Sequence, residues 1–236
     1  MIINKKNINV NIIRKEVKKK GYFILPALYS KKQVNKIVNL IKKSFELSKE
    51  IKKSGHYKKN MKDMIRLDVG EYKASTRLAR FFFKFPWNKN NNEISIIAEQ
   101  LFSLRCSLSN SNNLLMEKVK KKLTKKIFCM SYIIQYPKGG GFMSVHREYP
   151  IKNKKDNLFV VYLALTTKKK DFSTGGAYVI KKGKEVLIED IIKAGDVAVY
   201  LGSLKHGVRP IDQDQKLDLD KINGRMMFMP VINYFK

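Results

Sequence analysis

The feature of the sequence that most constrains its fold is a row of short apolar segments in the second half of the chain. Turns containing Gly, Asp and Lys separate them at intervals of about eight to fifteen residues, which is typical of an all-β sandwich or barrel. Eight strands are expected, the number required for two sheets wound as a jelly roll. The expected strands are residues 129–136, 142–148, 158–166, 177–181, 185–188, 197–201, 207–211 and 225–234.

The first half of the chain predicts helices. Ser30 is a candidate N-cap, and the apolar residues after it recur at steps of three and four, which indicates an amphipathic helix over residues 31–53. The aromatic run 81–87 is interpreted as a strand packed into the core, with a pocket lining as the alternative. The remaining expected elements are a strand at 21–26 and helices at 93–108 and 113–126.

The chain has 236 residues, 44% of them hydrophobic, enough to bury a sizeable core. It contains no internal repeat and no composition break that would mark a linker. We therefore expect a single α+β domain over residues 1–236. Residues 1–127 would supply mainly helical support, and residues 128–236 would form the jelly-roll core.

The net charge of +29 allows two interpretations. Residues 1–125 carry 30 basic and 9 acidic groups, a net +21, which would suit a phosphate-binding surface. However, Lys accounts for 41 of the 49 basic residues and Arg for only 8, and Arg is the better residue for bidentate phosphate contacts. A bias toward Lys, Asn and Ile, whose codons are A/T-rich, would give the same charge with solvated lysine faces. Both interpretations remain open.

The chain shows neither a secretory signal nor an apolar stretch approaching the ~20 residues of a membrane span. Its two cysteines, Cys106 and Cys129, form neither a disulfide framework nor a metal-site spacing, which suits a reducing compartment. A cytoplasmic protein without a membrane partner is expected. No sequence feature specifies an oligomeric state.

Three histidines are present, and His56 lies in a polar segment where solvation is the expected role. His146 and Glu148 stand two apart in an expected strand, so their side chains would share one face. His206 would add a third ligand from a neighbouring strand. Two histidines and one carboxylate form the facial triad of non-haem Fe(II) oxygenases. Taken alone, His146 would be better explained as an ordinary strand histidine.

Four segments carry a resemblance to a known family. "GYFILPALYSKKQVNKIVNLI", "GGGFMSVHRE", "GDVAVYLGSLKHGV" and "GRMMFMPVINYF" are similar to motifs of the Fe(II)/2-oxoglutarate-dependent oxygenases, in particular the phytanoyl-CoA dioxygenase-like branch. The resemblance covers about residues 21–235 and implies a double-stranded β-helix. It implies Fe(II) on His146, Glu148 and His206, with 2-oxoglutarate and O₂ as co-substrates. Arg225 would pair with the distal carboxylate of 2-oxoglutarate, helped by Tyr132, Gln135 or Tyr136.

The chain departs from the usual family pattern at three points. The carboxylate ligand is Glu148 rather than Asp, and Arg225 lies unusually far beyond His206 because residues 212–220 form an insertion. Met227 stands where many relatives carry Ser or Thr as a second co-substrate contact.

Arg225 should share a strand face with Met227 and Met229, which would bury its guanidinium inside the barrel. A buried cation requires an anion. No acid occupies an obvious pairing position on the nearby strands, so 2-oxoglutarate is the expected partner. The alternative is an ion pair with Asp212, Asp214 or another acid of the insertion, in which case Arg209 is the next candidate anchor.

The resemblance implies hydroxylation of a small-molecule substrate, with desaturation as a variant and with release of succinate and CO₂. Halogenation is not expected, because Glu148 fills the position that halogenases of this superfamily vacate for chloride. Two rivals remain: a nucleic-acid hydroxylase or demethylase that uses the basic first half, and a non-catalytic cupin-like binding module. Candidate substrate residues near the pocket mouth are Arg147, Tyr149, Arg77 and Arg80.

Overall fold

The computed structural model describes residues 8–47, 61–72, 75–85, 87–88, 93–109, 127–148 and 159–234. The second half contains the eight expected strands, each ending within about two residues of its predicted bounds. They are β4 (Ile127–Tyr136), β5 (Gly141–His146), β6 (Phe159–Ala164), β7 (Gly176–Lys181), β8 (Lys184–Leu187), β9 (Val197–Leu201), β10 (Lys205–Ile211) and β11 (Arg225–Tyr234), with a short 3₁₀ turn, η2 (Ile188–Asp190), after β8.

The first half also contains one strand and one helix that were not expected from the sequence. The expected strand, the long amphipathic helix and the helix near residue 100 are present as β1 (Tyr22–Leu25), α2 (Lys31–Leu47) and α3 (Glu93–Ser109). The expected helix at 113–126 lies outside the described residues, as does His56. The aromatic run expected as a strand forms the end of β3 (Ser75–Lys84), where Phe82 and Phe83 are buried, and Phe81 also lines the cavity described below. The additional elements are α1 (Val10–Lys20) and β2 (Met64–Tyr72), which forms a hairpin with β3.

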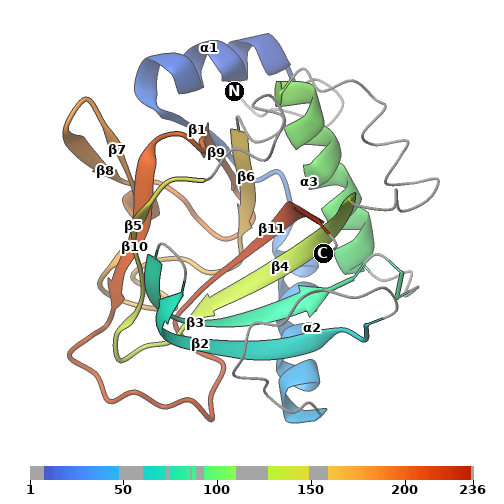
Figure 1. The fold of residues 1–236 in the computed structure, drawn as a ribbon, viewed down its shortest axis with the longest axis vertical. Helices are drawn as coiled ribbons and strands as arrows, with labels where there is room; N and C mark the ends of the chain where they lie inside the picture. The colour runs from blue at the N-terminus through green and yellow to red at the C-terminus, as the bar shows by residue number, and fades with distance from the viewer. Residues whose placement is uncertain are drawn as a thin grey trace.

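The strands run in the order β1-β9-β6-β11-β4-β3-β5-β10-β7-β8, with β2 on the outer side of β3 (Figure 1). Strands β5, β10, β7 and β8 form the second wall of the jelly roll, facing the β9-β6-β11-β4 wall. β3 joins the two walls because it pairs with β4 along one part and with β5 through Arg77 and Leu78. This is the expected double-stranded β-helix, enlarged by the β2–β3 hairpin.

Alternation along the central strands divides the apolar residues into two cores. On β6, Val161 and Leu163 belong to the core shared with the helices, whereas Val160 and Tyr162 belong to the core inside the barrel. Successive strand residues point to opposite faces, so a continuously apolar strand is needed where both faces are covered. The sequence from 159 to 164 is such a strand, and all six residues are buried.

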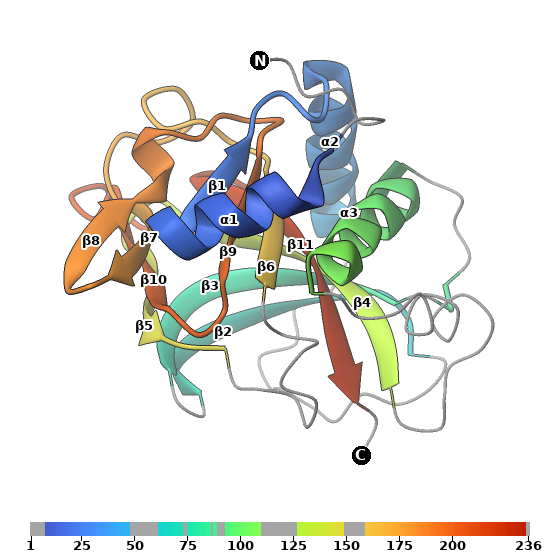
Figure 2. The same ribbon diagram turned by 90° about the horizontal axis from the view of Figure 1, so that it is seen from above.

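The three helices cover one face of the larger wall (Figure 2). Apolar residues such as Val17 of α1 and Ile37 of α2 face the sheet, while the lysines of both helices face outward. Asn9 caps α1 by accepting hydrogen bonds from the N–H groups of Asn11 and Ile12. Among the described residues, no helix combines the length and apolar character needed to cross a membrane.

Candidate metal and co-substrate site

A cavity of about 310 Å³ lies inside the barrel, between the β4–β11 and β5–β10 walls. Its apolar lining comes from β3, β4, β5, β7, β10, β11 and η2, and its polar lining contains the two strand histidines, tyrosines and arginines. The main apolar lining residues are Phe81, Ile134, Met143, Met227, Met229 and Val231.

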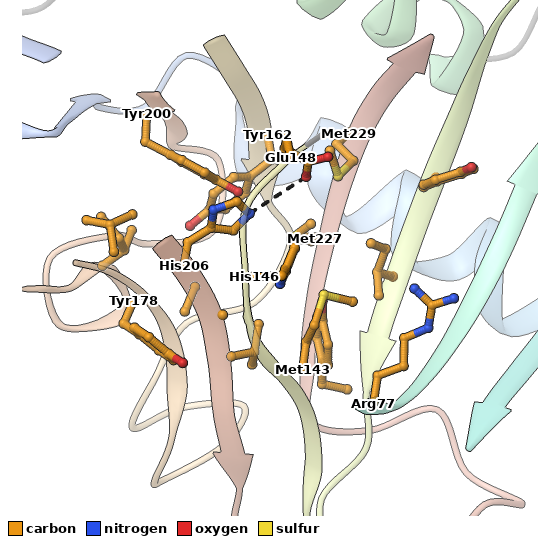
Figure 3. A pocket seen from close by; sticks show the side chains of 18 of the residues that line it. Arg77, Met143, His146, Glu148, Tyr162, Tyr178, Tyr200, His206, Met227 and Met229 are labelled. Atoms are coloured by element: carbon orange, nitrogen blue, oxygen red, sulfur yellow. Dashed lines mark hydrogen bonds and ion pairs between the residues drawn. The ribbon is translucent and has the colours of Figure 1, made fainter. Parts of the chain in front are cut away.

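His146, Glu148 and His206 meet in this cavity, as the sequence analysis predicted. One ligand atom from each lies within 4.8 Å of the others. His146 and His206 are register partners across the antiparallel pair β5–β10, with ring centroids 4.3 Å apart. Glu148 Oε1 lies 3.7 Å from His206 Nε2 (Figure 3).

Glu148 reaches the cluster by a route that differs from the expected one. β5 ends at His146, so Glu148 follows the strand instead of continuing it. Its backbone N–H donates to the carbonyl of Gly202, 2.9 Å away, in the turn between β9 and β10. That bond places the carboxylate beside the histidine that β10 contributes.

Hydrogen bonds fix which ring nitrogen of each histidine faces the cluster. His146 Nδ1 lies 2.9 Å from the carbonyl oxygen of Ser144, and His206 Nδ1 lies 2.8 Å from that of Leu204. A carbonyl only accepts, so each Nδ1 carries the proton and each Nε2 keeps a lone pair. His206 Nε2 is buried and has no hydrogen-bond partner among the described residues. These are the features of imidazoles oriented to bind a divalent metal through Nε2.

The charges of the cluster also suit a metal. Burial lowers the pKa of His146, and the neighbouring His206 lowers it further, so the imidazole stays neutral. Burial opposes ionisation of Glu148, but its interactions with His206 and His146 outweigh burial and hold the pKa of the carboxyl below its usual value. A neutral His146, an ionised Glu148 and a His206 whose Nδ1 proton is hydrogen-bonded to Leu204 form a donor set that fits Fe(II).

A second polar part of the cavity is formed around Arg225. Its side chain faces the barrel interior, as predicted from the strand face that it shares with Met227. The structure corrects the expectation that no acid lies near it. Arg225 Nε donates to Oε2 of Glu189 at 2.8 Å, and both side chains are at most 2% exposed. Burial would lower the pKa of the guanidinium, but Glu189 together with Tyr162 and Tyr136 outweighs burial and the net shift is upward, so the charge is kept. Glu189 was missed because η2, which carries it, folds back into the barrel beyond the end of β8.

Two donors beside this ion pair are buried without a hydrogen-bond partner among the described residues. They are Arg225 Nη1 and Tyr162 Oη. The guanidinium carbon of Arg225 lies 5.3 Å from the ring centroid of Tyr136 and 5.6 Å from that of Tyr162. Burial raises the pKa of Tyr136 to about 12 and that of Tyr162 further, so both phenols remain protonated. Unpaired buried donors are costly, and this set fits the carboxylate of a dicarboxylic co-substrate.

The other residues predicted to contact the co-substrate lie on two different faces of β4. Tyr132 and Tyr136 line the cavity, and Tyr132 packs edge-on against Phe83. Gln135 lies between them in sequence and therefore points to the opposite face of β4. There its Oε1 accepts a 2.5 Å hydrogen bond from Arg80, and its Nε2 donates to the carbonyl of Asn223. The prediction that Gln135 contacts the co-substrate is therefore corrected.

Of the arginines predicted to contact the substrate, two line the cavity and one does not. Arg77 lines the cavity, apart from the histidine cluster in Figure 3, and forms an ion pair with Asp68 at 2.5 Å. Arg147 lines the cavity and is largely exposed. Arg80 does not reach the cavity, because it lies on the same face as Gln135 and donates to the carbonyl of Leu219. Tyr149 lies outside the described residues.

Asp212 of the insertion and Arg209 are both engaged away from the cavity. Asp212 accepts hydrogen bonds from the backbone N–H groups of Ser173 and Thr174, so it braces a loop. Arg209 pairs with Glu185 at 2.7 Å on the outer surface. Neither arrangement supports the alternative ion pair of Arg225 or the alternative anchor.

Two tyrosines of the site were not identified from the sequence. Tyr162 and Tyr200 lie on β6 and β9, and the ring of Tyr200 lies 4.9 Å from that of His206. Their signal was a single hydroxyl-bearing residue within an otherwise apolar buried strand, a position where the hydroxyl needs a partner.

Comparison with solved structures then decides the fold. A prolyl-4-hydroxylase from Pseudomonas putida matches with a TM-score of 0.58 and 12% identity over 97% of this chain and 98% of that chain. The fold is that of the 2-oxoglutarate/Fe(II) oxygenases. A prolyl hydroxylase from Trichoplax adhaerens, solved with a hypoxia-inducible-factor peptide, matches with a TM-score of 0.55 and 15% identity over 96% and 88%.

A third oxygenase structure extends the comparison beyond prolyl hydroxylases. The carbocyclase SnoK from nogalamycin biosynthesis, described as non-haem and α-ketoglutarate-dependent, matches with a TM-score of 0.56 and 13% identity over 98% of this chain and 86% of that chain. No family model matches the sequence, and no curated protein matches it either. The jelly-roll fold class expected from the sequence is confirmed, whereas the phytanoyl-CoA dioxygenase-like branch still rests on the sequence motifs alone.

Proposed function

We propose that this protein is an Fe(II)- and 2-oxoglutarate-dependent oxygenase that hydroxylates a small molecule. The observation that carries the proposal is the convergence of His146, Glu148 and His206, with both imidazoles held in one tautomer and each Nε2 facing the cluster. The unpaired donors of Arg225 and Tyr162 in the same cavity add a site for the distal carboxylate of 2-oxoglutarate.

Bound Fe(II) would supply O₂ activation, coupled to oxidative decarboxylation, so that R–H, 2-oxoglutarate and O₂ give R–OH, succinate and CO₂. The protein would contribute orientation and exclusion of water. His146, Glu148 and His206 would hold the metal, Arg225 and Tyr162 would bind the distal carboxylate, and the methionines and Phe81 would exclude water. Because Glu148 provides a carboxylate ligand, hydroxylation is proposed instead of halogenation.

A small and mainly apolar substrate suits the size and lining of the cavity. The solved neighbours include an enzyme of nogalamycin biosynthesis and a hydroxylase bound to a peptide, so this fold serves both kinds of substrate. Arg77 and Arg147 are the charged lining residues that we propose for orienting the substrate. Membership of the phytanoyl-CoA dioxygenase-like branch is also part of this proposal.

The test requires no knowledge of the substrate. Under anaerobic conditions, Fe(II) and 2-oxoglutarate added to the protein should produce the visible charge-transfer band of the metal chelate, and one Fe(II) should bind per chain. A His146→Ala, His206→Ala double variant should lose both the band and the iron, while Glu185→Gln on the outer surface should keep them. Stoichiometric iron in the double variant would refute the assignment of the ligands.

A further inference from the structure

The ion pair between Arg225 and Glu189 lies where the proposed co-substrate would bind. Arg225 Nε donates to Glu189 Oε2 at 2.8 Å, and the N–H of Ala177 donates to the same oxygen at 2.9 Å. The two charged side chains are 1% and 2% exposed. The guanidinium is thus neutralised from within the protein before any ligand arrives.

The position of Glu189 depends on a residue without a side chain. Gly176, the first residue of β7, has a φ of +121°, and a Cβ there would lie 2.4 Å from Glu189 Cβ and 2.6 Å from Cγ. Both the backbone conformation and the contact exclude other residues. The absence of a side chain at Gly176 therefore leaves the space that the Glu189 side chain occupies on its way into the barrel.

Glu189 accepts a hydrogen bond from only one of the guanidinium nitrogens of Arg225. The Nε edge is bonded, whereas Nη1 is buried without a partner among the described residues, as is the neighbouring Tyr162 Oη. A carboxylate that accepted from Nη1 and Tyr162 would share one cation with Glu189. Two anions on one buried guanidinium repel each other in a medium that screens charge poorly.

We propose that Glu189 is a positioning and affinity-setting residue for the co-substrate. It holds Arg225 in place and supplies its counter-charge when the cavity contains no co-substrate, and it thereby weakens the binding of the distal carboxylate of 2-oxoglutarate. This inference rests on the proposed function. A purely structural ion pair would stabilise the protein without limiting the affinity for the ligand.

The decisive variant is Glu189→Gln, which keeps the volume and an oxygen acceptor for Arg225 Nε but removes the negative charge. The dissociation constant of 2-oxoglutarate, titrated anaerobically on the Fe(II)-loaded protein, should fall about tenfold, or about 1.4 kcal/mol. The melting temperature of the metal-free protein without 2-oxoglutarate should fall as well, because Arg225 loses its counter-charge. Tighter binding by a less stable protein is the expected signature.

Glu185→Gln is the matched control. It removes the same charge from an exposed ion pair on the adjacent strand β8, where Glu185 meets Arg209, so the affinity for 2-oxoglutarate should not change. An unchanged or weaker affinity in Glu189→Gln, with normal chelation by the unaltered protein, would overturn the inference and leave the proposed function intact. Failure of the unaltered protein to form the chelate with Fe(II) and 2-oxoglutarate would instead overturn the proposed function, and this inference with it.

Discussion

At the scale of single residues, the site combines two groups with opposite requirements. The histidines need a free Nε2, which the carbonyl acceptors of Ser144 and Leu204 provide by fixing the Nδ1 protons. Arg225 needs an anion at all times, which Glu189 provides. The protein alone therefore pre-orients the metal cluster, while the co-substrate anchor is partly satisfied by Glu189.

The first prediction concerns Arg225 as the co-substrate anchor. Arg225→Ala would leave the buried carboxylate of Glu189 without a counter-charge and destabilise the protein. The informative variant is therefore Arg225→Met combined with Glu189→Gln. Loss of a charged hydrogen-bond pair should raise the apparent KM for 2-oxoglutarate by about 10²-fold, while Fe(II) affinity without co-substrate changes little. Steady-state succinate formation and an iron titration give the two quantities. An unchanged KM in the folded double variant would contradict the assignment.

At the scale of elements, alternation along the strands determines what the sequence could predict. The eight barrel strands were predictable because short apolar runs between turns have few other solutions, and His146, His206 and Arg225 inherited their facing from these strands. Gln135 was wrongly grouped with Tyr132 and Tyr136. It lies an odd number of residues from each of them along β4, so its side chain points to the opposite face, which the helices cover.

The missed elements have a physical reason as well. β2 does alternate, with apolar Ile65, Leu67 and Val69 separated by polar Arg66 and Asp68, but its polar face is buried as well, because Arg66 and Asp68 form an ion pair inside the protein. A charged residue at a buried position looks like a surface residue in sequence. Glu189 was hidden for a related reason: its pairing with Arg225 crosses the barrel and leaves no local signal.

The second prediction uses adjacent residues of β6. Leu163→Ala opens a cavity in the core shared with the helices, which should cost about 2–5 kcal/mol of unfolding free energy with little change in the KM for 2-oxoglutarate. Tyr162→Phe removes an unpaired buried hydroxyl inside the barrel, so stability should change little while the KM rises several-fold. Chemical denaturation and succinate assays on both variants measure the two effects. Equal effects of the two variants on KM would show that the strand faces do not separate support from binding.

At the scale of the whole molecule, the exposed lysines of α1 and α2 and the cavity lie on different sides of a sheet. The exposed lysines of α1 and α2 belong to helices that pack on the face of the larger wall opposite the barrel interior. Residues 1–236 are proposed to act as one domain in which the helices cover the sheet and the jelly roll holds the site. A polyanion bound by these lysines would be separated from His146 and His206 by the sheet.

The third prediction follows from that separation. A DNA or RNA duplex should bind weakly through the lysines, with an affinity that falls steeply between about 50 and 200 mM salt, because phosphate contacts release counterions. Lys18→Gln combined with Lys19→Gln should weaken this binding, yet succinate formation should be the same with and without duplex and the same in both proteins. Stimulation of succinate formation by duplex that persisted at the higher salt concentration would instead identify nucleic acid as the substrate and assign the basic half a role in catalysis.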